Sequence, residues 1–324
     1  MPRAVIGDEL GPLSNYSLRS HDPGPPGPTE LRIAVKAIGV SFVDVLVTEG
    51  RYQVRPPVPF IPGSECAGII EAVGSEVSGL AAGQRVLVMG WHRMFADIVN
   101  APATAVWPIP ANLSFDAAAV FMVSYATSWH ALVDRAELKA GESLLVLGAG
   151  GATGLAAVQI GAWLGANVIA SASSQAKRAL ASDGGAAKLV DSRSETWRDD
   201  VRAANDDKAI DVVFDPIGGD ATERAFRTLA WKGRHLVVGF PAGIPSLPTN
   251  LALLKGASLV GVNHGAVGMH EPELARANHT KILELAGRGV LAPAIARRYP
   301  LDRFGDAMAE AATGDTAGRI VLIP

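Results

Sequence analysis

The residues with the clearest chemical pattern form a glycine-rich turn, LGAGGATG, at positions 147–154. Three of them match the fixed positions of a Gly-x-Gly-x-x-Gly fingerprint, with alanine in the first position. Such a turn brings backbone N–H groups close to a pyrophosphate, and the helix that follows adds a partial positive charge. We therefore expect these residues to contact the phosphates of a dinucleotide: Ala149, Gly151, Ala152, Thr153 and Gly154.

The elements around the turn favour this interpretation. An apolar run at 144–147 precedes it, a helix-period stretch covers 152–164, and a second apolar run follows at 168–170. Strand, turn, helix and strand in this order make one βαβ unit. A fingerprint alone is weak, so a structural turn in another α/β protein is the alternative. Residues 143–176 are uncharged, as a membrane span would be, but Gly and Ser divide them into short runs typical of buried parallel strands.

The end of the second strand bears on which dinucleotide binds. Enzymes that use NAD carry an acidic residue there for the ribose diol, whereas this chain has ASASS at 170–174. Ser173 and Ser174 leave room for a 2′-phosphate, and Lys177, one helical turn further on, would oppose its charge. The pattern predicts NADPH rather than NADH. The alternative for Lys177 is a solvated helix residue.

Composition limits the possible classes of protein. A chain of 324 residues with 48% hydrophobic residues is expected to form two domains with large cores. The net charge of −3 gives no basic surface for nucleic acid. The sequence does not open with the pattern of a signal peptide, and its single cysteine, Cys66, fits a reducing compartment. We therefore expect a cytoplasmic protein with Cys66 buried in a strand.

The first 115 residues have the pattern of a β domain. Apolar runs at 31–38, 66–73, 85–89 and 95–100 alternate with Pro- and Gly-rich loops. Short strands without a long helix predict a barrel-like fold. Ser114 is then expected to cap a helix that runs to about Asp134.

The rest of the chain alternates between strands and helices. Strands are predicted at 144–148, 167–171, 187–191, 210–215, 234–239 and 257–262. This alternation predicts a doubly wound parallel sheet with its ligand at the carboxyl ends of the strands. A helix near 272–287, a strand, a helix from about Asp302 and a last strand, RIVLIP, follow. Because this tail is too short for a domain, we expect it to complete the N-terminal one.

Several longer segments resemble one known family. They are GVSFVDVLVTEGRYQVRPPVPFIPGSECAG at 39–68, EAVGSEV at 71–77, LKAGESLLVLGAGGATGLAAVQIG at 138–161, VVFDPIGGD at 212–220, LVVGF at 236–240 and the terminal GRIVLIP. The chain is similar to the zinc-independent quinone oxidoreductase branch of the medium-chain dehydrogenase/reductase superfamily, the branch of zeta-crystallin. The resemblance implies an α/β protein with a GroES-like β-barrel domain at 1–118, a Rossmann domain for NADPH at 119–262 and a return to the first domain at 263–324.

The resemblance also implies residue roles. Tyr52 matches a tyrosine of the family's active-site cleft, Thr127 a residue near the nicotinamide ribose, and Gly239 and Phe240 the backbone near its carboxamide. Ser41 stands where relatives usually carry Asn, so it either hydrogen-bonds a substrate carbonyl or only fills space. Asp44 and Asp215 are expected to be structural. Asn263 and His264 follow the last Rossmann strand, where they either face the cleft or lie at the surface.

Two serines bear on metal binding. Zinc-dependent relatives bind catalytic zinc through a Cys and a His at the positions of Ser41 and Ser64, and a serine hydroxyl is a poor zinc ligand. One cysteine also rules out a four-cysteine structural zinc site. We therefore expect no metal.

The expected activity is hydride transfer from NADPH to a quinone, with binding and electrostatics in place of a metal. Reduction of α,β-unsaturated carbonyls or enoyl thioesters is the main alternative, because its hydride chemistry is similar. A third possibility is a crystallin-like protein that binds NADPH without turnover. We further expect a homodimer that takes a small-molecule substrate, with no nucleic-acid partner and no insertion into membranes. The sequence does not identify the physiological substrate.

Overall fold

The computed structural model describes residues 1–324 apart from Val54. The chain forms two compact units, one of Met1–Val123 with Ala292–Pro324 and the other of Ser124–Leu291. The chain passes from the first unit to the second after residue 123 and returns after residue 291, whereas the predicted domain boundaries were 118 and 262. The segment from 263 to 291 therefore belongs to the second unit and does not return to the first. Over the described part of the chain, no helix is both long enough and apolar enough to span a membrane.

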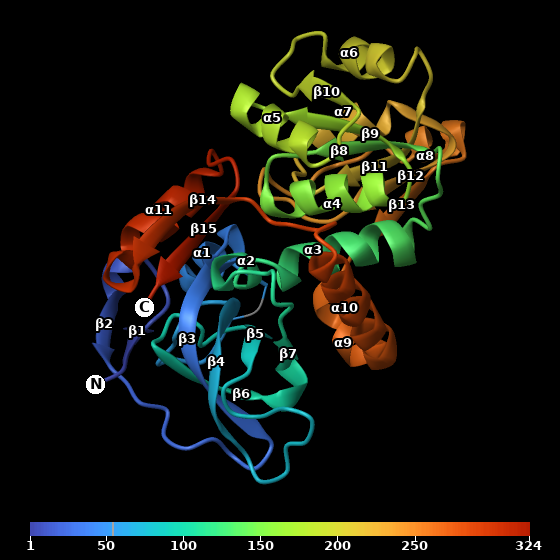
Figure 1. Ribbon diagram of the computed structural model, residues 1–324. Helices are drawn as coiled ribbons and strands as arrows, with labels where there is room; N and C mark the ends of the chain where they lie inside the picture. Colours follow the sequence, from blue (N-terminus) through green and yellow to red (C-terminus); the bar gives the residue numbers. More distant parts are fainter. Residues whose placement is uncertain (54) are drawn as a thin grey trace. The chain divides into compact units, whose positions relative to one another are not determined.

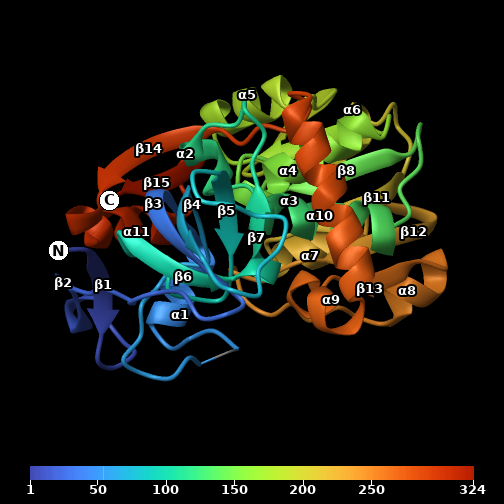
Figure 2. The ribbon, with the colours of Figure 1, turned by 60° about the horizontal axis from the view of Figure 1, so that its bottom comes forward.

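The first unit is built on a largely antiparallel sheet (Figure 1). In spatial order its strands are β14 (Ile295–Pro300), β15 (Arg319–Ile323), β3 (Glu30–Val40), β4 (Glu65–Val73), β5 (Arg85–Met89) and β7 (Val106–Pro108). β6 (Ile98–Pro102) also pairs with β3, while β1 (Arg3–Gly7) and β2 (Tyr16–Ser20) pair with each other. Figure 2 shows the red β15 beside the blue β3, with which it pairs antiparallel. The terminal strand thus lies in the sheet of the first unit.

The core of this unit follows from alternation along β3. Leu31, Ile33 and Val35 are buried, whereas the residues between them are partly exposed, as expected for a strand with one face on a core. β4 and β15 add Cys66, Ile70 and further apolar side chains to the same cluster. Cys66 is buried, as predicted. The helices α1 (Phe42–Thr48), α2 (Phe115–Ala118) and α11 (Phe304–Thr313) lie in this unit.

The second unit contains a six-stranded parallel sheet. Its strands in spatial order are β10 (Lys188–Asp191), β9 (Asn167–Ala172), β8 (Ser143–Leu147), β11 (Ile210–Asp215), β12 (Leu229–Val237) and β13 (Ser258–Gly261). All six predicted strands are confirmed, although β12 runs from 229 to 237 where 234–239 was predicted. The order reverses between β8 and β11, so a ligand is expected outside the carboxyl ends of these two strands.

Helices pack against this sheet (Figures 1 and 2). They are α4 (Ala152–Trp163), α5 (Gln175–Asp183), α6 (Trp197–Ala204), α7 (Asp220–Phe226) and α8 (Asn250–Lys255). Two further helices of this unit, α9 (His264–His270) and α10 (Pro272–Gly287), pack on each other. α10 confirms the helix predicted near 272–287. The short helix α9 was not predicted from the sequence.

The helix predicted from Ser114 to Asp134 is not continuous. The Ser114 hydroxyl does cap α2, since it accepts a hydrogen bond from the N–H of Ala117 at 3.2 Å. The helix stops at Ala118, and a second helix, α3 (Met122–Trp129), continues into a π-helical turn, His130–Arg135. The break falls where the Ala119 carbonyl packs onto Gly39: a Cβ on that glycine would lie 2.2 Å from the oxygen. Tertiary packing therefore overrides local helix preference here.

Candidate functional site

The glycine-rich turn joins β8 to α4 at the carboxyl edge of the second sheet. Gly148 adopts a positive φ of 58°, which glycine tolerates. A Cβ on Gly154 would lie 2.2 Å from the Gly148 carbonyl oxygen, so the first turn of the helix packs directly on the end of the strand. The N–H of Ala149, which is fully buried, donates to the Ser171 carbonyl of β9 at 3.1 Å. These contacts fix the turn tightly between the two strands.

The same turn fits the phosphate groups of a dinucleotide. Gly151 is the N-cap of α4, and among the described residues no side chain caps this helix. The first N–H groups of a helix have no intrahelical acceptor, so they are suited to bind an anion. α4 is twelve residues long, which is enough for a substantial helix dipole.

Lys177 packs beneath this turn. A Cβ on Gly150 would lie 2.4 Å from the Cβ of Lys177, so only glycine fits over the lysine stem. Lys177 is 8% exposed and is therefore not a solvated helix residue, which contradicts the alternative considered from the sequence. Its helix, α5, is capped by the Ser174 hydroxyl, which accepts a hydrogen bond from the Lys177 N–H at 3.3 Å. Ser173, half-buried, precedes this cap.

Arg178, next to Lys177, contacts different groups. Its guanidinium donates to the Ala172 carbonyl at 3.0 Å and pairs with Asp191 at 2.9 Å. Asp191 is the last residue of β10, so this pair ties the ends of β9 and β10 together. The arginine charge is opposed within the protein by a carboxylate.

Asp215, at the end of β11, holds the next turn in place. It accepts hydrogen bonds from the N–H groups of Ile217 and Gly218, both at 2.9 Å. Thr222 Oγ1 donates to it at 2.6 Å, and His235 Nε2 lies 3.0 Å away. Burial acts to raise the pKa of Asp215, but these hydrogen bonds together lower it below its usual value. The structural role expected for Asp215 agrees with this geometry.

The turn after β11 adjoins the other predicted cofactor residues. A Cβ on Gly148 would lie 2.7 Å from Ile217 Cδ1, and one on Gly218 would lie 2.6 Å from the Cβ of Phe240. Gly239 and Phe240 directly follow β12, and Phe240 is partly exposed. The end of β12 therefore lies beside the turn that follows β11.

Thr127 lies on α3, and its neighbour Ser128 donates a hydrogen bond to the Thr153 carbonyl at 2.8 Å. The other predicted cofactor residues follow the carboxyl ends of β8, β9 and β12. Their roles in binding stay predictions.

In the first unit, Ser41 is the N-cap of α1. Its N–H and its hydroxyl donate to Asp44 Oδ2 at 2.8 and 2.6 Å, and the Asp44 N–H donates back to Ser41 Oγ at 3.2 Å. This reciprocal arrangement is a capping box formed with an aspartate. The Ser64 side chain also hydrogen-bonds Asp44, which is fully buried. Burial raises the pKa of Asp44, although the hydrogen bonds from Ser41 and Ser64 act against that shift.

A buried ion pair lies next to this cluster. Arg319 of β15 contacts Glu65 at 3.3 Å, and the N–H of Val123 donates to the other Glu65 oxygen at 3.1 Å. Burial raises the pKa of Glu65 to about 7, against the opposing effect of Arg319. The sequence analysis did not find this pair, because its members stand 254 positions apart and neither belongs to a local motif.

Tyr52 lies beside Trp91, which the sequence analysis also missed. Their ring centroids are 6.5 Å apart and the ring planes are tilted by 42°. Burial raises the pKa of Tyr52 above its ordinary value. In the part of the chain that the structure describes, no group hydrogen-bonds the Tyr52 hydroxyl. Of the two predicted catalytic residues, Tyr52 therefore has its proton available, whereas that of Ser41 is directed at Asp44.

His264 is not the solvated surface residue that was one alternative from the sequence. Its side chain is half-buried, and its ring centroid lies 5.8 Å from that of His279 on α10. Burial lowers the pKa of His264 to about 4, with smaller contributions from the charges of His279 and His130. Burial also lowers the pKa of His279 to about 4. Asn263 is exposed.

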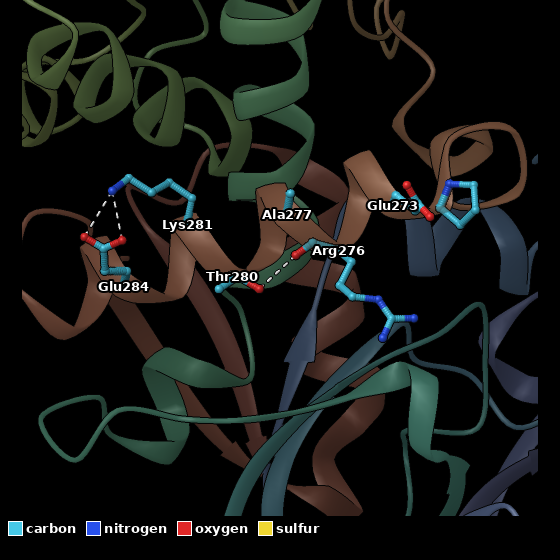
Figure 3. Close-up of a pocket in the computed structure, with 7 residues that line it drawn as sticks. Glu273, Arg276, Ala277, Thr280, Lys281 and Glu284 are labelled. Atoms are coloured by element: carbon cyan, nitrogen blue, oxygen red, sulfur yellow. Dashed lines mark hydrogen bonds and ion pairs between the residues drawn. The ribbon is translucent and has the colours of Figure 1, made fainter. Parts of the chain in front are cut away.

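A separate hollow of about 750 Å³ follows one face of α10 (Figure 3). It is lined by Pro272, Glu273, Arg276, Ala277, Thr280, Lys281 and Glu284. An ion pair of 2.8 Å between Lys281 and Glu284 lies along it. No predicted site residue lines this hollow. Leaving Val54 aside, no group of three or more His, Cys, Asp or Glu side chains is arranged to hold a metal ion.

Comparison with known proteins agrees with this architecture. Residues 27–111 match the alcohol dehydrogenase GroES-like domain, and residues 152–278 match the family described as zinc-binding dehydrogenase. A quinone oxidoreductase-like protein 2 homolog of Nematostella vectensis is 36% identical over 99% of this chain and 88% of its own length. The chain therefore belongs to the medium-chain dehydrogenase/reductase superfamily, among its quinone oxidoreductase-like members.

Two solved structures share the fold over the whole chain. A probable oxidoreductase from Mycobacterium abscessus has a TM-score of 0.89 and 32% identity, and the match covers 100% of this chain and 99% of that one. The Escherichia coli quinone oxidoreductase complexed with NADPH has a TM-score of 0.90 and 26% identity, over 99% of this chain and 100% of that one. The predicted fold, a GroES-like domain with a Rossmann-type parallel sheet, is confirmed, and the family supports an oxidoreductase.

Proposed function

We propose that this protein is an NADPH-dependent reductase of quinones. The observation that carries the proposal is the position of Lys177, whose stem packs under the glycine-rich turn at Gly150. The end of β9 carries Ser173 and Ser174 in place of an acidic residue, so nothing there repels a 2′-phosphate. A relative of this chain, the Escherichia coli quinone oxidoreductase, was solved as a complex with NADPH, which supports the same choice of coenzyme.

The coenzyme would be held along the carboxyl edge of the second sheet. The backbone of Gly151–Gly154 would bind its pyrophosphate, and Lys177 its 2′-phosphate. Thr127, Gly239 and Phe240 would contact the nicotinamide end. Bound there, NADPH supplies the two electrons of the reduction as a hydride.

The acceptor oxygen gains negative charge during this reduction and needs a hydrogen-bond donor. The Tyr52 hydroxyl is suited to this role, because it has no acceptor among the described residues and its raised pKa keeps it protonated at neutral pH. Ser41 already donates its hydroxyl proton to Asp44, so it has no proton left for the substrate oxygen unless Asp44 is itself protonated.

The chemistry of the donor set favours a reaction without zinc. Ser41 and Ser64 occupy the positions of zinc ligands in related enzymes, yet both hydroxyls are weak ligands and both hydrogen-bond Asp44. We expect purified protein to contain less than stoichiometric zinc by mass spectrometry and to keep its activity in the presence of EDTA. Activity that is lost with EDTA and restored by zinc would contradict this proposal.

The activity itself is tested by following NADPH oxidation with a panel of quinones and a panel of enones. We expect turnover with quinones and a lower kcat/KM with NADH than with NADPH. A kcat/KM that is higher for enones would assign the chain to enone reduction instead. Tight NADPH binding without turnover on either panel would indicate a crystallin-like role.

We also propose a homodimer that forms through β13. This strand pairs with β12 on one side only, and Leu259 on it is 51% exposed. Leu253, Leu254 and Trp231 are exposed on neighbouring segments, and a Cβ on Gly256 would lie 3.1 Å from the Trp231 ring. An open edge with exposed apolar residues is suited to pairing with a second copy. A cytoplasmic location remains a prediction from the single cysteine.

A further inference from the structure

The aromatic pair in the first unit indicates what kind of acceptor this chain prefers. Among the described residues of this unit, the exposed large hydrophobic side chains are Met1, Val58 and Trp91, and Trp91 is 52% exposed. Met1 begins the chain and Val58 is small, so among the described residues of this unit the indole is the most exposed extended aromatic surface. Flat aromatic rings stack favourably on such a surface.

The turn that carries Trp91 is firmly anchored. The N–H of Gly90 donates to the Ser64 carbonyl at 2.8 Å, and the N–H of Arg93 donates to the Ile61 carbonyl at 2.8 Å. The ring of His92 packs edge-on against Phe60, with centroids 6.0 Å apart. The backbone on both sides of Trp91 is therefore held by hydrogen bonds, so an incoming ring meets a pre-positioned segment and binding orders less of the chain.

The same contacts link Trp91 to the predicted catalytic residues. Ser64 holds the turn through its carbonyl and hydrogen-bonds Asp44 through its side chain, and Asp44 accepts hydrogen bonds from the N–H and hydroxyl of Ser41. The Tyr52 ring lies 6.5 Å from the indole. The exposed indole therefore lies next to the Tyr52 ring, on a turn that is hydrogen-bonded to the Ser64 segment.

We propose that Trp91 is a specificity-determining residue that stacks on the ring system of the acceptor, so that the protein prefers quinones with two or more fused rings over single-ring quinones. This inference rests on the proposed function and narrows its substrate class. A second fused ring adds apolar area over the indole, whereas a single ring close to the Tyr52 hydroxyl gains less from it.

Two fully substituted quinones form a matched pair of probes. These are 2,3-dimethyl-1,4-naphthoquinone and duroquinone, which differ in ring number and have no free quinone-ring position that reacts with thiols. Calorimetry with NADP⁺ present measures the Kd of each without reduction. We expect Trp91→Ala to raise the Kd of the naphthoquinone ~5- to 10-fold and that of duroquinone less than ~2-fold, and Trp91→Phe to keep most of the affinity.

Trp163→Ala is the control, since Trp163 is a partly exposed tryptophan of the second unit that packs on Trp129. It should change neither Kd, and thermal melts should show that all three variants are folded. Equal effects of Trp91→Ala on both quinones, or no effect on either, would overturn the inference. So would a wild-type protein that does not prefer the naphthoquinone. Because calorimetry measures binding without turnover, the two proposals can fail independently. A protein that does not oxidise NADPH with any quinone would overturn the proposed function, whereas the Kd values alone decide the role of Trp91.

Discussion

At the scale of single residues, the Ser41 hydroxyl is already used in local hydrogen bonds that cap α1. Ser41 begins α1, donates to Asp44 and accepts from the Asp44 N–H. These bonds satisfy polar groups at the helix start that would otherwise be left open. A serine that performs this structural task has little freedom to serve a substrate as well.

Replacing Ser41 separates the two roles. We expect Ser41→Ala to lower the free energy of unfolding by about 1 kcal/mol, because the cap is lost. Ser41→Asn should retain most of that stability, since asparagine is also a good N-cap and is the usual residue in relatives. Chemical denaturation measures the stability, and steady-state kinetics on the same variants measures kcat. A fall in kcat with Ser41→Ala that far exceeds the loss of folded protein would show that Ser41 acts on the substrate.

Lys177 gives the second prediction at this scale. Lys177→Ala should weaken NADPH binding by ~10- to 100-fold and NADH binding by less than ~3-fold, because the lost ionic contact involves only the 2′-phosphate. Lys188→Ala is a matched control, since Lys188 is an exposed lysine on the neighbouring strand β10. Fluorescence titration with both coenzymes measures the two values. Equal weakening of NADPH and NADH by Lys177→Ala would contradict the assignment.

At the scale of elements, α9 and α10 are joined by two histidines. His264 and His279 pack ring to ring, and burial lowers the pKa of each to about 4. His130 and Asp134, on the π-helical turn, also act on the pKa of His264. His130 Nδ1 lies 2.8 Å from Asp134, to which the Asn278 side chain of α10 also donates at 2.8 Å. These three segments therefore share one polar cluster.

This cluster predicts a pH dependence of stability. The two histidines have lower pKa values in the folded protein than the ordinary 6.5, so below pH 6.5 the unfolded chain binds more protons than the folded chain. This contribution to stability should therefore be complete above pH 6.5 and fall as the pH decreases from 6.5 to about 4, by on the order of 3 kcal/mol for each histidine. Urea unfolding across this range, with the double variant His264→Gln, His279→Gln, tests the claim. If the free energy of unfolding of the double variant falls between pH 6.5 and 4 as steeply as that of the wild type, the prediction is wrong.

How well each element could be predicted depended on whether its determinants are local. The turn at Gly148–Gly154 and the strands of the second sheet were predictable, because their glycine spacing and apolar runs lie within short windows. The break after Ala118 was not, since it depends on Gly39 packing against Ala119. Glu65–Arg319 and Tyr52–Trp91 were missed for the same reason: each pair meets only after the sheet of the first unit has formed.

At the scale of the whole molecule, the two units carry different parts of the proposed reaction. The second gathers the predicted coenzyme residues at its sheet edge, and the first holds Tyr52, Trp91 and Ser41. The match with the Nematostella relative covers 99% of this chain and 88% of that protein, so it includes the segments of both units.

The proposed dimer is tested at this scale. Leu259→Arg places a charge on the open β13 edge, and we expect it to convert a dimer into a monomer of 33.6 kDa by light scattering. Leu189→Arg is the control, because Leu189 is an exposed leucine on β10, at the opposite edge of the same sheet. This control should remain dimeric. A wild-type protein that is monomeric at micromolar concentration would remove the basis of the proposal.

The first unit is assembled from both ends of the chain, with β15 inserted between β14 and β3. During synthesis, the whole second unit is translated before Arg319. The second unit can therefore fold as it emerges, whereas the sheet of the first unit must wait, with Glu65 lacking its cationic partner. We expect nascent chains that end before β14, and that carry a C-terminal spacer longer than the ribosomal tunnel, to protect the Rossmann-type sheet from proteolysis while β3 and β4 are still cleaved.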